Sequence, residues 1–215
     1  MPTVFVLGND QLIREMWKSA GYNIVSSPAY ADILQWTGGA DIDPRLYNQK
    51  PIPTTGPINT ERDAYEIDMF SKYPDKIKVG ICRGSQFLNV MNGGSLWQDV
   101  DNHTQRHILY SKRHPQGAVV TSTHHQMMRP APAGKVLAWA FESTRMTDDA
   151  YTLSLPNRDH SPENPLDSKQ IEDADVEAVM YEDTATFCFQ PHPEYGIYSC
   201  YRIFFDLFEE NLLAA

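Results

Sequence analysis

The sequence has few cysteines, no long apolar run and no basic segment. Its three cysteines, Cys82, Cys188 and Cys200, are odd in number and widely spaced, which argues against a disulfide framework. We therefore expect reduced thiols and a cytoplasmic location. No apolar stretch reaches the length that crosses a bilayer, and the first residues lack the basic region and small-residue cleavage site of a signal peptide.

The chain also lacks a surplus of positive charge. Its 18 lysines and arginines stand against 28 aspartates and glutamates, which gives a formal net charge of −10. Nucleic-acid backbones are bound by clustered basic side chains, so this balance argues against a nucleic-acid partner. An apolar content of 41% over 215 residues is that of a globular protein, and we expect a single domain spanning residues 1–215.

Apolar, β-branched runs alternate with helical patterns along the chain. Strands are predicted at 3–7, 22–25, 31–36, 77–81, 117–121, 136–141, 175–181 and 185–189, and helices at 11–20, 61–73 and 201–213. This alternation predicts a parallel sheet, whose ligand sites lie at the carboxyl ends of the strands. Gly38, Gly39 and Cys82 each follow such a strand, so we expect them to converge.

The most informative stretch runs from Lys78 to Phe87, where an apolar run ends at a cysteine and a helical pattern follows. This order predicts a strand, an abrupt turn at Cys82 and a helix. Gly80 and Gly84 remove Cβ atoms on both sides of the turn, as a tight elbow requires. The amino end of the helix favours a thiolate, so Cys82 is a candidate nucleophile. The alternative is a buried, inert cysteine, against which the flanking glycines argue.

A candidate base lies far downstream of this elbow. His192 stands between two prolines that restrict the backbone, and Glu194 lies two residues on, on the same side of an extended segment. A distant histidine with a carboxylate beside it would complete a nucleophile–base–orienter set with Cys82. In this interpretation Cys82 attacks, His192 carries the proton and Glu194 holds the imidazole in one tautomer.

With these motifs the sequence resembles the class I glutamine amidotransferases and the related γ-glutamyl hydrolases of the peptidase C26 family. The matching blocks are TGGADIDPRLY at 37–47, GICRGSQ at 80–86, NVMNGGSLWQD at 89–99, STHHQ at 122–126 and QPHPE at 190–194. They occur in family order and cover the chain from about residue 35 to 200. The pattern is most similar to the γ-glutamyl-γ-aminobutyrate hydrolases, which share the first block, the STHHQ-type block and an Arg-Asp-x-x-Glu segment like Arg62–Glu66.

The resemblance implies a fold and a set of roles. The fold is a three-layer, flavodoxin-like α/β domain with a mostly parallel central sheet, flanking helices and the cysteine on a nucleophile elbow. The backbone N–H groups of Gly39 and Arg83 would form the oxyanion hole. Without the resemblance, Gly38 and Gly39 would be taken as an ordinary turn pair. The residues implied in substrate binding are Gln86, Ser122, His124 and His125.

The activity implied is hydrolysis of the γ-glutamyl amide bond of a small compound, such as γ-glutamyl-aminobutyrate or a γ-glutamyl polyamine. The reaction would pass through a glutamyl thioester without metal or cofactor. An alternative is a glutaminase subunit that delivers ammonia to a separate synthetase, because the chain is shorter than typical members of the hydrolase branch. A synthetase and a second copy of the chain are the protein partners considered. A third hypothesis is a catalytically inactive binding or regulatory subunit. Such a subunit would be expected to lack Cys82, His192 or Glu194, and all three are present.

Three other segments carry weaker expectations. His103, His107 and His114 match no compact ligand spacing and have no cysteine or carboxylate cluster beside them, so no metal site is expected, and His103 is expected to line the pocket. Arg62, Asp63 and Glu66 fit a solvated helix face, although the resemblance gives them a part in shaping the pocket. The polar segment 143–174 is expected to wrap the surface as an insertion, which a lid or a partner-binding loop would explain.

Overall fold

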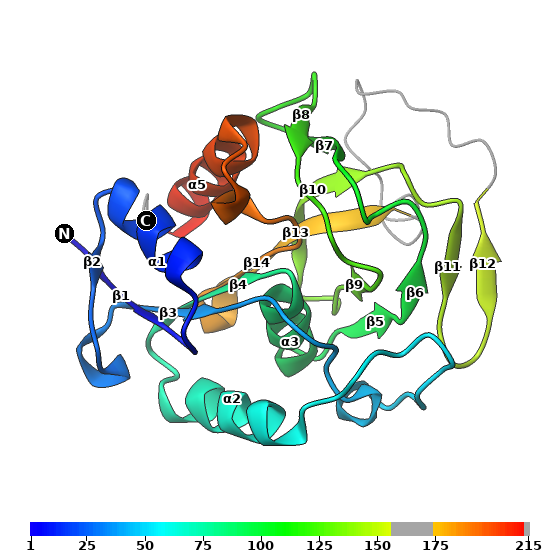
Figure 1. The fold of residues 1–215 in the computed structure, drawn as a ribbon, viewed down its shortest axis with the longest axis horizontal. Coiled ribbons are helices and arrows are strands. Elements are labelled where there is room, and N and C mark those ends of the chain that lie inside the picture. Colours follow the sequence, from blue (N-terminus) through cyan, green and yellow to red (C-terminus); the bar gives the residue numbers. More distant parts are fainter. Residues whose placement is uncertain (156–173, 213–215) are drawn as a thin grey trace.

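The computed structural model of the protein describes residues 1–155 and 174–212. A nine-stranded central sheet has the strand order β2-β1-β3-β4-β14-β13-β10-β7-β8 (Figure 1). In this order the strands are β2 (Asn23–Ile24), β1 (Thr3–Val6), β3 (Ile33–Trp36), β4 (Ile77–Ile81), β14 (Thr186–Phe189), β13 (Asp175–Tyr181), β10 (Lys135–Ala140), β7 (His107–Ser111) and β8 (Ala118–Val120).

The sheet has a parallel half and an antiparallel half. The strands from β2 to β14 pair in parallel, and β13, β10, β7 and β8 then pair antiparallel in turn. Seven of the nine strands consequently point the same way, since β13 and β7 are the reversed ones. The predicted α/β class with a mostly parallel central sheet is confirmed.

Helices cover both faces of the sheet. On one face, α1 (Gln11–Ser19) lies beside α5 (Tyr198–Leu212), where the Trp17 ring meets Phe204 and Phe208 with centroids 5.8 and 5.3 Å apart. On the other face lie α2 (Thr60–Lys72) and α3 (Arg83–Met91) (Figure 1). Each face has its own core, because alternate strand residues point to opposite sides. The three predicted layers are present.

Smaller elements extend the antiparallel half. β6 (Asp99–Val100), β11 (Arg145–Thr147) and β12 (Thr152–Ser154) form a three-stranded sheet, and β5 (Ser95–Trp97) pairs with β9 (Met127–Arg129). Single turns of 3-10 helix cover Pro28–Tyr30, Pro44–Tyr47, Glu182–Thr184 and Pro193–Tyr195. The segment expected to be an insertion thus begins with the β11–β12 hairpin, whereas 156–173 lies outside the described residues.

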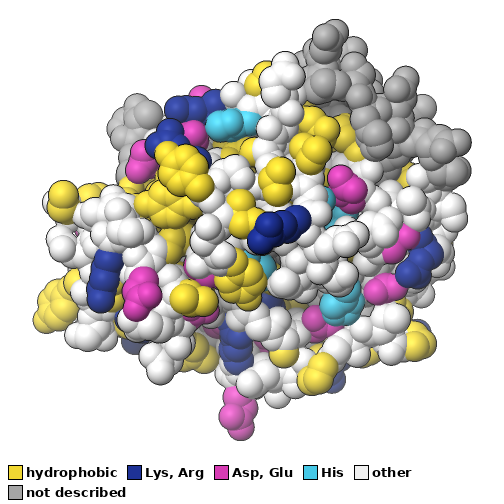
Figure 2. Space-filling view, turned by 45° about the horizontal axis from the view of Figure 1, so that its top comes forward, with side chains coloured by type: hydrophobic (Ala, Val, Ile, Leu, Met, Phe, Trp, Pro, Cys, Tyr) yellow, Lys and Arg dark blue, Asp and Glu magenta, His cyan; other side chains and the backbone are white. Residues whose placement is uncertain are grey.

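The surface agrees with a chain of mixed charge. Figure 2 shows acidic, basic and hydrophobic side chains interspersed over the face drawn. Within residues 1–155 and 174–212, every helix is too short or too polar to span a bilayer.

Candidate active site

The Cys82 elbow is a strained turn between a strand and a helix. Cys82 follows the last residue of β4 and caps α3, with φ 52° and ψ −115°. A positive φ at a residue other than glycine costs about 1–3 kcal/mol and is characteristic of functional sites. The Cys82 N–H donates to the Phe189 carbonyl at 3.0 Å, which ties the elbow to β14. The thiol is 7% exposed.

Two glycines make this turn sterically possible. A Cβ at Gly84 would lie 2.5 Å from the Trp36 carbonyl oxygen, and one at Gly80 would lie 2.5 Å from the Gly84 oxygen. Both contacts are with backbone, which cannot move aside as a flexible side chain does. The expectation that the elbow needs both glycines is confirmed.

His192 is held close to the elbow by the sheet. β14 runs parallel to β4 with Phe189 opposite Ile81, so His192 leaves the same edge as Cys82. The His192 N–H donates to the Thr121 carbonyl at 3.2 Å, and the Thr121 hydroxyl donates to the His192 carbonyl at 2.6 Å. These bonds fix the backbone on which the imidazole is carried.

The imidazole itself has two neighbours. Nδ1 lies 2.7 Å from Oε1 of Glu194, and the Tyr195 ring stacks on the imidazole with centroids 4.4 Å apart and planes 2° from parallel. Nε2 is buried without a hydrogen-bond partner in the described structure. Burial lowers the pKa of His192, but Cys82 and Glu194 outweigh it and raise that pKa to about 10. Cys82 and Glu194 therefore favour the protonated imidazole.

Gly38 is the backbone that packs against this pair. A Cβ at Gly38 would lie 3.1 Å from Cε1 of His192 and 3.8 Å from Cβ of Cys82. Gly39, with φ 139°, instead packs against the Arg62 guanidinium. The Arg83 N–H opens α3, where the first amides have no intrahelical acceptor. The structure thus brings the glycine pair, the elbow and His192 together, and Gly38 rather than Gly39 is the one in contact with both side chains.

The other two cysteines differ sharply from Cys82. Cys188 lies within β14 and Cys200 within α5, both fully buried. Burial raises the pKa of the Cys200 thiol to about 12 and that of Cys188 further still. Both are therefore neutral packing groups.

The four residues implied in substrate binding fall into two groups. Gln86, Ser122 and His124 are each about 3% exposed. Gln86 Nε2 donates to the Gln126 carbonyl at 3.1 Å, and His124 Nδ1 lies 2.9 Å from the same oxygen. Ser122 donates to the His103 carbonyl. These three side chains are thus occupied by backbone acceptors.

His125 is the more open of the four residues. It lies between Asp41 and Asp99, with ring nitrogens 3.3 and 3.5 Å from their oxygens. Hydrogen bonding to Asp41 raises its pKa, an effect that burial of the ring opposes.

The expectation of a solvated face on α2 is wrong for two of its three residues. Asp63 and Glu66 are 3% and 2% exposed and both pair with the buried Arg83 guanidinium. Arg62 donates to the Gly38 carbonyl at 3.0 Å and the Thr37 carbonyl at 2.8 Å. These charges bind α2 to the elbow helix and to the glycine pair, because a buried guanidinium must be neutralised.

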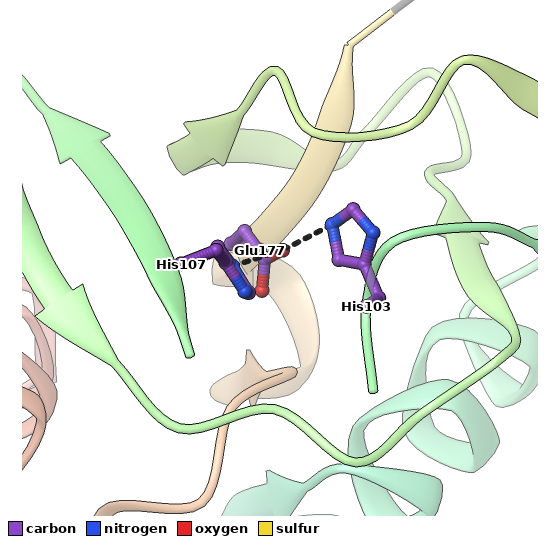
Figure 3. Close-up of side chains that lie close together, drawn as sticks. All are labelled: His103, His107 and Glu177. Carbon is purple, nitrogen blue, oxygen red and sulfur yellow. Dashed lines mark hydrogen bonds and ion pairs between the residues drawn. The ribbon is translucent and has the colours of Figure 1, made fainter. Parts of the chain in front are cut away.

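The structure brings a carboxylate from a distant strand beside two of the histidines of 101–115, where the local sequence has no carboxylate cluster. Figure 3 shows Glu177 of β13 between the imidazoles of His103 and His107. Its Oε1 lies 3.2 Å from Nε2 of His103 and 3.1 Å from Nε2 of His107. His103 is fully buried in this cluster instead of lining a pocket, whereas His114 lies apart and pairs with Asp206. β13 brings Glu177 in from about 70 residues away, which the local spacing does not reveal.

The cluster is strongly charged. The imidazoles around Glu177 hold its pKa well below the usual range, although burial alone would raise it. Burial lowers the pKa of His103, but Glu177 and Asp175 prevail and raise it to about 9. His124, whose Nε2 lies 4.0 Å from Oε2 of Glu177, has its pKa lowered well below the usual value by burial.

Two surface cavities reach neighbours of the Cys82–His192 pair, although neither is lined by Cys82 or His192 themselves. One of about 560 Å³ is lined by residues that include Thr37, Arg62 and Tyr65. The other, of about 490 Å³, is lined by residues that include Glu194 and Tyr198.

Comparison with known proteins adds a family to this geometry. The sequence model of peptidase C26 matches residues 27–194. The glutamine amidotransferase-like protein YvdE homolog of Lactococcus lactis subsp. cremoris is 31% identical over 134 residues, which are 52% of this chain and 71% of that protein. Protein NtpR of Enterococcus hirae is 35% identical over 115 residues, 49% of this chain and 47% of NtpR. The chain thus spans about half the length of NtpR.

Solved structures share the fold. A crystal structure from Thermoplasma acidophilum, described as that of a GMP synthase subunit, superposes with a TM-score of 0.61 over 100% of this chain and 95% of that one, at 15% identity. A glutamine amidotransferase from Thermotoga maritima gives a TM-score of 0.56 over 99% of this chain and 84% of that one, at 11% identity.

Proposed function

The chain belongs to the peptidase C26 family, and from this premise we propose that it is a cysteine-dependent hydrolase of γ-glutamyl amide bonds. The observation that carries the proposal is the arrangement around Cys82. A thiol on a strained helix amino end faces an imidazole whose other nitrogen is bound to a carboxylate. This is the nucleophile, base and orienter of acyl transfer.

The first half-reaction forms a thioester. The Cys82 thiolate attacks the γ-carbonyl carbon, a C–S bond forms, and the carbonyl electron pair moves onto oxygen. Backbone N–H groups at Gly39 and Arg83 are proposed to hold that oxyanion. As the C–N bond breaks, the His192 imidazolium gives its proton to the leaving amine, and Glu194 keeps Nδ1 in place.

The second half-reaction releases glutamate. The imidazole, now neutral, takes a proton from water, whose oxygen attacks the thioester carbon. The C–S bond then breaks, the thiolate returns and His192 is again an imidazolium beside it. Electrons and protons balance over the cycle without a redox partner.

Gln86, Ser122, His124 and His125 are proposed to shape the glutamyl subsite, the first three through the backbone they fix. The side chains of Gln86, Ser122 and His124 are hydrogen-bonded to the backbone carbonyls of His103 and Gln126, which supports a scaffolding contribution. His125, between two aspartates, is the side chain of the four best placed to meet a charged group of the substrate.

A second candidate is a glutaminase that supplies ammonia to a separate synthetase. The name of the Lactococcus lactis relative, a glutamine amidotransferase-like protein, favours it. Under this alternative, glutamine is the substrate and a partner protein stimulates turnover. The two candidates share the thioester chemistry and differ in the leaving amine.

Glutamate release by the purified chain separates these functions. Glutamine and a panel of γ-glutamyl amines are offered to the wild type and to Cys82→Ala, with buried Cys200→Ala as the matched control. We expect one γ-glutamyl amine to be cleaved fast, with activity about 10⁴-fold lower in Cys82→Ala and retained in Cys200→Ala. Slow release from glutamine alone would favour the synthetase-linked glutaminase. Undiminished activity in Cys82→Ala would refute the proposed nucleophile.

A further inference from the structure

Three histidines surround the buried carboxylate of Glu177, and a second buried carboxylate, Asp175, lies 3.7 Å from Nε2 of His103. None of these residues transfers a proton in the proposed reaction, and His124 alone is shared with the proposed glutamyl subsite, through the backbone it fixes. His103 comes from the loop before β7, His107 opens β7, His124 follows β8, and Glu177 lies in β13. All four are at most 5% exposed. Centroids of the His103 ring and the two other imidazoles lie 4.8 and 4.9 Å apart. The cluster is therefore almost closed off from bulk solvent.

The backbone determines which nitrogen of two histidines carries the proton. His103 Nδ1 lies 3.0 Å from the Asp101 carbonyl, and His124 Nδ1 lies 2.9 Å from the Gln126 carbonyl. A carbonyl oxygen only accepts, so each Nδ1 must be the N–H donor. In His124, whose pKa burial lowers well below its usual value, the other nitrogen, Nε2, is then a bare lone pair. In His103, whose pKa is raised, a metal ion would have to displace the proton on Nε2.

The Nε2 atoms of both histidines face the Glu177 carboxylate. Nε2 of His103 lies 3.2 Å from Oε1 of Glu177, and Nε2 of His124 lies 4.0 Å from Oε2. Nε2 of His124 and Oε2 of Glu177 have no hydrogen-bond partner in the described structure. Acceptors that face each other in a buried space repel unless a positive charge lies between them.

His107 adds a third nitrogen from the side of Glu177 opposite His103 (Figure 3). Its Nε2 lies 3.1 Å from Oε1 of Glu177. Histidines that ligate a metal commonly donate their second N–H to a backbone carbonyl, which is the arrangement of His103 and His124. The donor set of imidazole nitrogens and a carboxylate suits Zn²⁺ and its first-row neighbours.

The spacing also fits one ion. Two ligands at about 2.1 Å from a metal lie no more than about 4.2 Å apart. The distances from Glu177 oxygens to the three Nε2 atoms, 3.1, 3.2 and 4.0 Å, are within that limit. The ligand atoms of His103, His107 and Glu177 all lie within 4.8 Å of one another, so small side-chain shifts would bring them onto one centre.

We propose that His103, His107, His124 and Glu177 bind one divalent transition-metal ion of the Zn²⁺ class. Three nitrogens and one carboxylate supply the four ligands of a closed, structural site. The ion joins the loop before β7, the 122–126 block and β13. It thereby stabilises the backbone that Gln86 and Ser122 contact.

The test measures metal binding in Cys82→Ala, because the thiol is the one competing soft ligand near the elbow. This full-length protein is stripped with a chelator, dialysed and titrated with Co²⁺, whose visible spectrum reports four-coordinate nitrogen and oxygen ligation. Bound Zn²⁺ per chain is measured by mass spectrometry after dialysis. His107→Ala and Glu177→Gln are made in the same background, with His114→Ala as the control histidine, which pairs with Asp206 outside the cluster.

We expect one ion per chain, a higher melting temperature with metal, and binding at least about 100-fold weaker in His107→Ala and Glu177→Gln but unchanged in His114→Ala. Absence of binding by the folded Cys82→Ala protein would overturn the proposal. The positive charge beside Glu177 would then come from protons on the imidazoles. Equal binding by all four proteins would overturn it too, since the ion would be adventitious. If the two cluster variants fail to fold, the stoichiometry and spectrum of Cys82→Ala decide. No turnover is measured, so the outcome is independent of the proposed hydrolase activity.

Discussion

The molecule places histidine beside glutamate in two regions, and the two differ in which imidazole nitrogen faces the carboxylate. At the elbow, His192 turns Nδ1 to Glu194 and leaves Nε2 for Cys82. In the cluster, His103 turns Nδ1 to a backbone carbonyl and presents Nε2 to Glu177. The same two residue types are therefore suited to different tasks. The first arrangement directs a proton at a nucleophile, and the second assembles lone pairs around a cation.

The largest expected effect comes from removing the charge of each glutamate in turn. Glu194→Gln should lower kcat about 10²–10⁴-fold with little change in fold, because the imidazole loses its orienter. Glu194 also raises the pKa of His192, which is about 10 in the wild type, so the alkaline loss of activity should move to lower pH in the variant. Steady-state pH profiles check both results.

Glu194→Gln should also change how the free energy of unfolding depends on pH. His192 has a folded pKa of about 10 against an ordinary 6.5, so its contribution is fully present below pH 6.5 and is lost as pH rises through about 10. Glu194→Gln should reduce the contribution of His192 to the free energy of unfolding. Glu177→Gln should instead lower the free energy of unfolding by about 3 kcal/mol, since buried imidazoles lose their counter-charge. If Glu177→Gln impaired kcat alone and Glu194→Gln impaired stability alone, the contrast between the two regions would be reversed.

A smaller effect is expected on the stability of the elbow region. Gly84→Ala should lower the free energy of unfolding by about 3 kcal/mol, because the new Cβ would meet the Trp36 carbonyl at 2.5 Å. Gly196→Ala is the comparison: Gly196 has a positive φ, 81°, which Gly84 does not, and nothing lies within 4 Å of the added Cβ, so about 1 kcal/mol from backbone strain is expected. Urea unfolding measures the free energy of unfolding of both variants. A loss in Gly84→Ala no larger than in Gly196→Ala would mean that the close approach to Trp36 does not govern the turn.

The smallest effect concerns the ring on His192. Tyr195→Leu should lower kcat about 3–10-fold and leave KM unchanged, because a stacked ring worth about 1 kcal/mol limits imidazole motion. Tyr195→Phe keeps the ring and should retain wild-type kcat. Initial-rate kinetics of both variants provide the measurement. A loss in Tyr195→Phe as large as in Tyr195→Leu would assign the effect to the hydroxyl instead.

The sequence predicts what depends on neighbours in the chain. The strand, turn and helix around Cys82 follow from apolar periodicity and two glycines, and the structure has the strand at the predicted 77–81, with the helix directly after Cys82. The helix at 61–73 and the strand at 175–181 are likewise local patterns that the structure reproduces. The roles of Cys82, His192 and Glu194 stay predictions, although His192 and Glu194 are hydrogen-bonded.

The sequence does not predict what depends on sheet order. Glu177 reaches His107 because β13 and β7 lie on the two sides of β10 in the sheet, which no spacing within 101–115 encodes. One signal is present: the carboxylates of Asp175 and Glu177 stand in a strand that is apolar at its other positions, and buried carboxylates must find partners. The burial of Asp63 and Glu66 is not predictable from their own helix, because their partner, Arg83, lies on another one. Tyr195 carries no sequence signal for its stacking on His192.

The position of β14 has a consequence for how the protein is made. This strand lies between β4 and β13, so it joins the two halves of the sheet, yet it is the last strand along the described chain. After β4 has been synthesised, more than 100 further residues must follow before β14, one of the two strands that pair with β4, is available. During synthesis the thiol is thus exposed long before the imidazole arrives. The C-terminal strand acts as a late assembly step, and chains truncated before residue 186 lack both the sheet's junction and the residues that follow it at the site.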